Sequence, residues 1–184
     1  MFDKVVFDID DTLWGLNKRV CHRAHVPFQN ITTFLVGDNK NLTKDQIEAV
    51  VSQYWYPATW TNIKWYKGID KIKDLEKNYK CEVYLYTNCA TEELAKLKVE
   101  QAHIATGLPY DRIIANVTNQ HHRKRSLEGT YIFVDDSPYN IEQSTAAHVL
   151  TLNKPWNKTV YRDVKRFNYL NEIIDYIPTL LQRR

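Results

Sequence analysis

Five short apolar runs separated by helical patterns constrain the fold of this 184-residue chain more than any other feature. Three of the runs are nearly continuous rather than alternating, a pattern typical of strands that are buried on both faces of a sheet. Strands that alternate with helices predict a Rossmann-like, doubly wound parallel α/β fold. The predicted strands are Lys4–Phe7, Glu82–Tyr86, Ile113–Ala115, Tyr131–Val134 and Val149–Leu152.

The helices between these strands carry recognisable start signals. Thr91 stands as a helix N-cap before Glu92 and Glu93, and Ser137 stands as one before Pro138. Another helix is predicted after Gly68. A last helix is predicted from the apolar spacing of Val164, Phe167, Leu170, Ile174 and Ile177, ending before Pro178.

A long segment after the first strand interrupts the alternation. Residues 15–66 contain no convincing strand pair, and they are too many for an ordinary connecting loop. One helix is predicted near Thr43–Tyr54, opened by a capping box in which Thr43 faces Gln46. The sequence therefore predicts a core domain of residues 1–14 and 67–184, with a small helical insertion at 15–66.

Composition excludes several classes of protein. No apolar run approaches the roughly 20 residues that cross a bilayer, and no secretory leader is recognisable. The three cysteines lack metal-ligand spacing, which favours reduced thiols and a cytoplasmic location. The formal charge of +3 does not by itself indicate nucleic-acid binding.

The end of the first strand carries the strongest chemical signal, the carboxylates of Asp8 and Asp10. Residues i and i+2 of an extended chain point the same way, so these side chains should leave the strand side by side. Ligands of open α/β sheets bind at the carboxyl ends of the strands, and two carboxylates there favour a hard cation such as Mg²⁺. The alternative for an isolated Asp-x-Asp is a solvated acidic turn.

Two further strand ends supply matching groups. Thr87 and Asn88 follow one strand, and Asp135 and Asp136 follow another. A basic run between them, Arg123 to Arg125, offers a cation. Carboxylates, a hydroxyl and a cation at neighbouring strand ends are the groups that phosphoryl transfer requires.

These residues resemble the motifs of the haloacid dehalogenase-like (HAD) phosphatases. The Asp8–Leu13 segment resembles the first motif, the Thr87 strand end the second, Lys124 the lysine of the third, and Asp135 with Asp136 the acidic fourth. The resemblance covers the chain from Lys4 to about Leu152. It implies that the insertion is a cap of the first type.

Within the superfamily the chain looks most similar to the C-type cytosolic 5′-nucleotidases, the 5′(3′)-deoxyribonucleotidase group. The short cap, Tyr86-Thr87-Asn88 and the Pro155-Trp156-Asn157 segment carry this likeness. Asp11 departs from the glycine that this group places there. The Asp11–Trp14 tract equally resembles magnesium-dependent phosphatase-1.

The resemblance implies a role for each motif residue. Asp8 would attack phosphorus and form an aspartyl-phosphate, and Asp10 would exchange protons with the leaving oxygen and with water. Mg²⁺ would be held by Asp8, the Asp10 carbonyl and Asp135. Thr87, Asn88 and Lys124 would bind the phosphoryl group, with Arg123 and Arg125 competing for the lysine role. Asp136 would ligate through water or orient the lysine.

Aromatic residues are concentrated near the insertion, where four of the five tryptophans fall. One or two of them are predicted to stack on a substrate base, and the others to pack the insertion. The predicted substrate contacts are Trp14, Phe34 and Trp60.

Three functions remain open on sequence alone. The preferred one is a Mg²⁺-dependent phosphatase of (deoxy)nucleoside monophosphates. A second is a phosphatase of nucleic-acid ends or phosphoproteins. Binding to a polymer would need a set of basic residues, and the chain contains such a set. The third is a non-catalytic binding module of the same fold, which intact Asp8 and Asp10 disfavour. The basic set is Arg112, Arg123, Lys124, Arg125, Lys154, Lys158, Arg162, Lys165 and Arg166.

Overall fold

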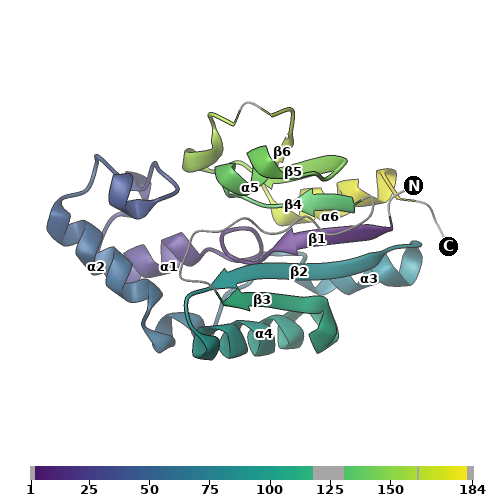
Figure 1. Cartoon of the computed structure of the whole chain (residues 1–184), viewed down its shortest axis with the longest axis horizontal. Coiled ribbons are helices and arrows are strands. Elements are labelled where there is room, and N and C mark those ends of the chain that lie inside the picture. Colours follow the sequence, from purple (N-terminus) through teal and green to yellow (C-terminus); the bar gives the residue numbers. More distant parts are fainter. Residues whose placement is uncertain (1–2, 118–130, 161, 182–184) are drawn as a thin grey trace.

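A computed structural model describes residues 3–117, 131–160 and 162–181. Six strands form one parallel sheet in the order β3-β2-β1-β4-β5-β6 (Figure 1). The predicted doubly wound fold is therefore confirmed. The strands are β1 (Lys4–Asp8), β2 (Glu82–Cys89), β3 (Ile113–Val117), β4 (Tyr131–Val134), β5 (His148–Leu152) and β6 (Lys165–Phe167).

Alternate side chains of the central strands pack on opposite faces of the sheet. Val5 and Phe7 of β1 join the larger core, whereas Val6 joins a smaller cluster on the other face. The helices α3 (Ile72–Asn78), α4 (Glu92–Thr106) and α6 (Leu170–Tyr176) contribute to the larger core, and α5 (Pro138–Gln143) contributes to the smaller one.

The helix start signals are confirmed. The Thr91 hydroxyl accepts from the Leu94 amide at 3.2 Å, and the Ser137 hydroxyl accepts from the Asn140 amide at 3.4 Å. At Thr43 both hydrogen bonds of the capping box are present.

The prediction for the C-terminal region was partly wrong. Val164 and Phe167 do not belong to the last helix, because the chain forms the edge strand β6 at Lys165–Phe167 before α6 begins. The amide of Asn153 donates to the Phe167 carbonyl at 2.8 Å, so pairing with β5 prevails over the helical spacing. A three-residue strand is too short to show a period of its own.

The segment between β1 and α3 is helical in the part of the chain described. It contains α1 (Leu16–Arg23), which the sequence did not predict, and α2 (Lys44–Tyr54), together with short 3₁₀ turns that include η2 (Val36–Asp38) and η3 (Pro57–Trp60). Its two ends meet where the Tyr66 amide donates to the Leu13 carbonyl at 2.9 Å. In Figure 1, α1 and α2 lie beyond the carboxyl ends of the strands.

Across the described ranges, no helix has the length and apolar character needed to span a bilayer.

Candidate active site

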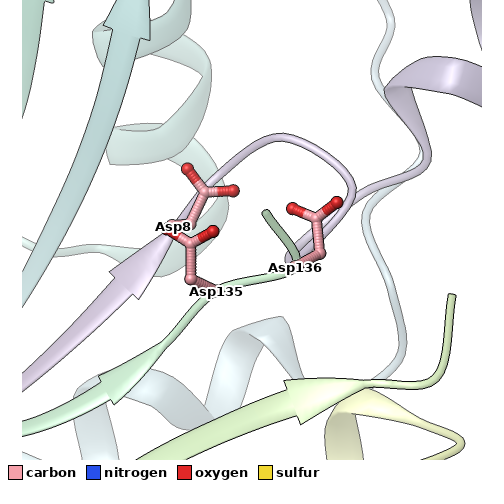
Figure 2. Close-up of side chains that lie close together, drawn as sticks. All are labelled: Asp8, Asp135 and Asp136. Carbon is pink, nitrogen blue, oxygen red and sulfur yellow. The ribbon is translucent and has the colours of Figure 1, made fainter. Parts of the chain in front are cut away.

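Three buried carboxylates meet at the carboxyl ends of β1 and β4. Asp8 is the last residue of β1, and Asp135 and Asp136 directly follow β4. Each can place an oxygen within 4.8 Å of the others, and Figure 2 shows the three side chains together at the strand ends. Because β1 and β4 are parallel neighbours, the sheet itself brings these residues together.

Hydrogen bonds fix the orientation of two of these carboxylates. Asp135 accepts from the Ser137 amide at 2.8 Å and from the Asn140 side chain at 3.0 Å. Asp136 accepts from the Thr12 hydroxyl at 3.3 Å and from the Trp156 indole at 2.7 Å. The start of α5 and the turn after β5 therefore hold the acidic site in place.

The electrostatics of this cluster favour a cation. Burial, followed by the charges of Asp11, Asp8 and Asp135, raises the pKa of Asp136 well above its ordinary value, and Lys154 only partly opposes the shift. Carboxylates held this close repel one another, and hard oxygen ligands suit Mg²⁺. The donor set of Asp8, Asp135 and Asp136 therefore fits a magnesium ion.

Asp11 occupies a special position in the loop after β1. Its φ is 55°, a left-handed conformation that aspartate tolerates better than most residues. This tolerance explains how Asp11 can occupy the position at which the group that the sequence resembles has glycine. The Asn17 amide lies 3.1 Å from both of its carboxylate oxygens. Burial is the main cause that raises the pKa of Asp11 to about 7, and the charge of Lys154 offsets part of the increase.

Asp10 has different surroundings, although it lies only two residues from Asp8. Its Oδ1 accepts from the Trp14 indole at 3.1 Å, and its Oδ2 accepts from the Thr87 hydroxyl at 3.2 Å. The ammonium of Lys98 also forms an ion pair with Oδ2. Asp10 is therefore held by donors, whereas Asp8 lies among other carboxylates.

Lys98 is a functional candidate that the sequence interpretation missed. It belongs to α4 and only 3 % of its side chain is exposed, and its Nζ lies 3.1 Å from the Thr87 hydroxyl and 3.0 Å from the Asn88 carbonyl oxygen. One sequence signal was present: Lys98 lies four residues after Leu94 and four before Ala102, on the buried side of the helix. A lysine in a buried stripe is rare without a partner.

These groups share one pocket of about 620 Å³. Asp8, Asp10, Thr87 and Lys98 are among its polar lining, and apolar residues of η2 and α2 line it from the insertion side. Phe34 makes an edge contact with Tyr139 of α5 at a centroid distance of 5.9 Å. The pocket thus combines acidic side chains with aromatic ones, and we call Phe34 and Tyr139 its aromatic wall.

The structure brings most of the predicted site residues together. Asp8, Asp10, Thr87, Asn88, Asp135 and Asp136 line the pocket, as do Phe34 and Trp60. Trp14 is buried and contacts Asp10, and it is absent from the pocket lining. Lys124, Arg123 and Arg125 lie outside the described residues.

Comparisons with known proteins agree on the fold. No protein-family model matches the sequence, and no curated protein matches it. Among solved structures, a Bacteroides fragilis protein named as a haloacid dehalogenase-like hydrolase shares 13% identity over 94% of this chain and 100% of its own, with a TM-score of 0.61.

Two further structures show the same likeness. The Bacillus subtilis protein YfnB, named as a HAD-hydrolase and determined with bound magnesium, shares 12% identity over 96% of this chain and 99% of its own, with a TM-score of 0.57. The β-phosphoglucomutase of Clostridium difficile shares 12% identity over 97% and 96%, with a TM-score of 0.55. The chain therefore has the HAD-like fold.

Proposed function

We propose that this protein is a Mg²⁺-dependent phosphomonoester hydrolase that acts through an aspartyl-phosphate on Asp8. One observation carries the proposal. A cluster of buried carboxylates and a differently held carboxylate, Asp10, open into the same pocket together with Thr87 and Lys98. Phosphoryl transfer needs a nucleophile, a proton carrier, a metal site and donors for phosphate oxygens, and these residues provide that set.

The metal would be held by Asp8, Asp135 and the Asp10 backbone carbonyl, with Asp136 beside them. When bound, Mg²⁺ would polarise the phosphoryl group and offset the charge that gathers on its oxygens. The mutual repulsion among the buried carboxylates supports this assignment.

The protein groups divide the remaining chemistry. Asp8 attacks phosphorus, and the bond to the leaving oxygen breaks as Asp10 delivers a proton to that oxygen. Water then attacks the aspartyl-phosphate while Asp10 removes its proton, which releases inorganic phosphate and regenerates Asp8. Thr87 and Asn88 hydrogen-bond the phosphoryl oxygens, and Lys124 stays a prediction for this role.

We propose (deoxy)nucleoside monophosphates as the substrates, with residues 15–66 acting as the cap. The pocket volume of about 620 Å³ suits a nucleotide-sized ligand. Phe34 and Tyr139 at the pocket, joined by Trp55 of the insertion, provide aromatic surfaces on which a base can stack. The three buried free cysteines fit the reducing cytoplasm, our proposed location.

Three of the basic residues that suggested a nucleic-acid substrate, Arg112, Arg162 and Arg166, have structural partners. Arg112 pairs with Glu76 and Glu82, and Arg162 donates to a backbone carbonyl within α5 and to one after it. Arg166 donates to Asn157, at 3.0 Å from its side-chain oxygen and 2.7 Å from its carbonyl. These contacts favour a structural role over an open polymer-binding groove.

A phosphate-release panel tests this function. Purified protein with and without Mg²⁺ is given deoxynucleoside and ribonucleoside monophosphates, sugar phosphates, 5′-phosphorylated oligonucleotides and an aryl phosphate. We expect release from the mononucleotides that stops when EDTA is added. Release from oligonucleotides alone would overturn the substrate class, and no release from any substrate would favour a binding module.

A further inference from the structure

Three side chains donate to the carboxylate of Asp10. The Trp14 indole donates to Oδ1, and the Lys98 ammonium and the Thr87 hydroxyl donate to Oδ2. A fourth residue, Trp60, contacts two of these donors, Trp14 and Lys98. Its ring lies edge-on to Trp14 at 5.5 Å, and the Lys98 ammonium lies 4.3 Å from its centroid.

We infer that Trp14, Trp60 and Lys98 act as positioning residues that orient Asp10 for proton transfer, so that the insertion controls the acid through Trp60. We name these three residues the Asp10 clamp. The inference rests on the proposed function, in which Asp10 moves protons. It reassigns Trp14 and Trp60, which the sequence interpretation placed against the substrate.

The burial of the two tryptophans supports this reassignment. Trp14 is 2 % exposed and does not line the pocket, and Trp60 lines the pocket but is only 3 % exposed, so each has little surface left to offer a base. The Trp60 indole N–H donates to the Tyr54 carbonyl at 3.0 Å, at the end of α2. Trp60 is therefore anchored within the insertion, while its ring packs against Lys98 and Trp14.

The chemistry of Lys98 explains why an aromatic ring should lie over it. A buried ammonium needs compensation for lost water, and a tryptophan face and an ion pair both provide it. The Asp10 carboxylate, the Thr87 hydroxyl and the Asn88 carbonyl supply the remaining partners. Lys98 thus reaches the proton carrier and the predicted phosphate-binding groups at once.

This arrangement gives Lys98 two alternative partners during the reaction. While Oδ2 accepts from both Lys98 and Thr87, it cannot present a proton to a leaving group. A phosphate dianion bound at Thr87 and Asn88 would draw the ammonium toward its own oxygens. Oδ2 is then free to take a proton from solvent and pass it to the leaving oxygen, while Trp14 keeps Oδ1 in place.

The test compares two substrates that differ in their need for an acid. Phenethyl phosphate has a poor leaving group that must be protonated, whereas 4-nitrophenyl phosphate departs unaided. The quantity measured is the ratio of the two kcat/KM values, because kcat/KM reports the step in which the leaving oxygen departs and not the later hydrolysis that both substrates share. A variant that only damages the fold or the metal site lowers both rates and leaves the ratio unchanged.

The variants separate the clamp from the acid. We expect Asp10→Asn to lower the ratio by about 10²-fold or more, and Trp14→Phe, Trp60→Leu and Lys98→Met to lower it by about 10-fold. Trp60→Phe keeps a ring over Lys98 and should restore most of the ratio. Lys96→Met, on the exposed side of α4, is the matched control and should leave the ratio unchanged.

The outcomes distinguish the two levels of the proposal. If Asp10→Asn lowers the ratio but Trp14→Phe, Trp60→Leu and Lys98→Met do not, the clamp is wrong and the proposed function stands. If Asp10→Asn leaves the ratio unchanged, Asp10 is not the acid and both fail. Thermal unfolding of each variant shows whether it is folded.

Discussion

Asp8 and Asp10 leave the same strand end and have the same chemistry, yet the fold gives them opposite surroundings. Asp8 lies in a buried cluster with the carboxylates of Asp135 and Asp136. Asp10 faces two hydrogen-bond donors and a buried ammonium. One carboxylate therefore lies beside like charges, whereas the protein itself provides a counter-charge for the other.

This difference matches the division of labour in the proposed reaction. A nucleophile is best held in a rigid acidic site with a metal nearby, and a proton carrier is best held by groups that can exchange partners. Three predictions test the comparison and a fourth tests the rest of the pocket, in order of decreasing effect.

Asp8→Asn should abolish turnover, by at least about 10⁴-fold in kcat, because the amide is a poor nucleophile. Phosphate release from the best mononucleotide measures the loss. Asp175→Asn, an exposed aspartate on α6, is the control and should keep wild-type activity. Wild-type rates in Asp8→Asn would exclude the covalent mechanism.

Asp11 tests what happens to a buried carboxylate that lacks sufficient compensation. Its pKa is about 7 in the folded protein against 3.8 ordinarily, so its ionisation opposes folding as the pH rises from about 4 to 7. Asp11→Asn removes this opposition. Relative to wild type, its free energy of unfolding should therefore increase over that interval, by as much as about 4 kcal/mol.

Denaturant unfolding in EDTA at a series of pH values measures this difference. Loss of the hydrogen bonds from Asn17 adds an offset that does not depend on pH, so the slope carries the result. A difference that stays constant from pH 4 to pH 7 would contradict the raised pKa of Asp11.

Magnesium should stabilise the folded protein through the carboxylate cluster of Asp8 and Asp135, and this stabilisation should not require Lys98. At 100 times its dissociation constant it contributes about 2.7 kcal/mol, which raises the Tm by roughly 5–10 °C for a chain of this size. Asp135→Asn should remove most of this shift, whereas Lys98→Met should retain it. Differential scanning fluorimetry with and without Mg²⁺ provides the measurement, and equal loss in both variants would mean that the two regions are not separate.

Phe34 tests the aromatic wall, away from both carboxylates. Phe34→Ala should raise KM for a nucleoside monophosphate by about 10-fold, because base stacking contributes about 1–3 kcal/mol. Ribose 5-phosphate lacks the base, so its KM should change by less than about 2-fold. An equal increase for both substrates would indicate that Phe34 shapes the pocket without contacting a base.

Much of this architecture could be predicted from local sequence patterns. Continuous apolar runs such as Val5–Phe7 identify buried parallel strands, and the position of Asp8 and Asp135 at strand ends places them at one edge of the sheet. Thr87 was predicted to follow its strand, but β2 continues through it to Cys89. The edge strand β6 escaped prediction because three residues carry no readable period. The helix α1 escaped because its polar residues mask the apolar ones.

The sequence by itself determined the order of the first five strands, most of the helices between them and the carboxylates at the ends of β1 and β4, because periodicity and spacing are properties of neighbouring residues. Only the tertiary structure decided how each carboxylate is surrounded. Lys98 reaches Asp10 from 88 positions away, and Trp60 reaches Lys98 from a different segment of the chain. Such contacts depend on how α4 and the insertion pack over the strand ends, and no local pattern records that packing.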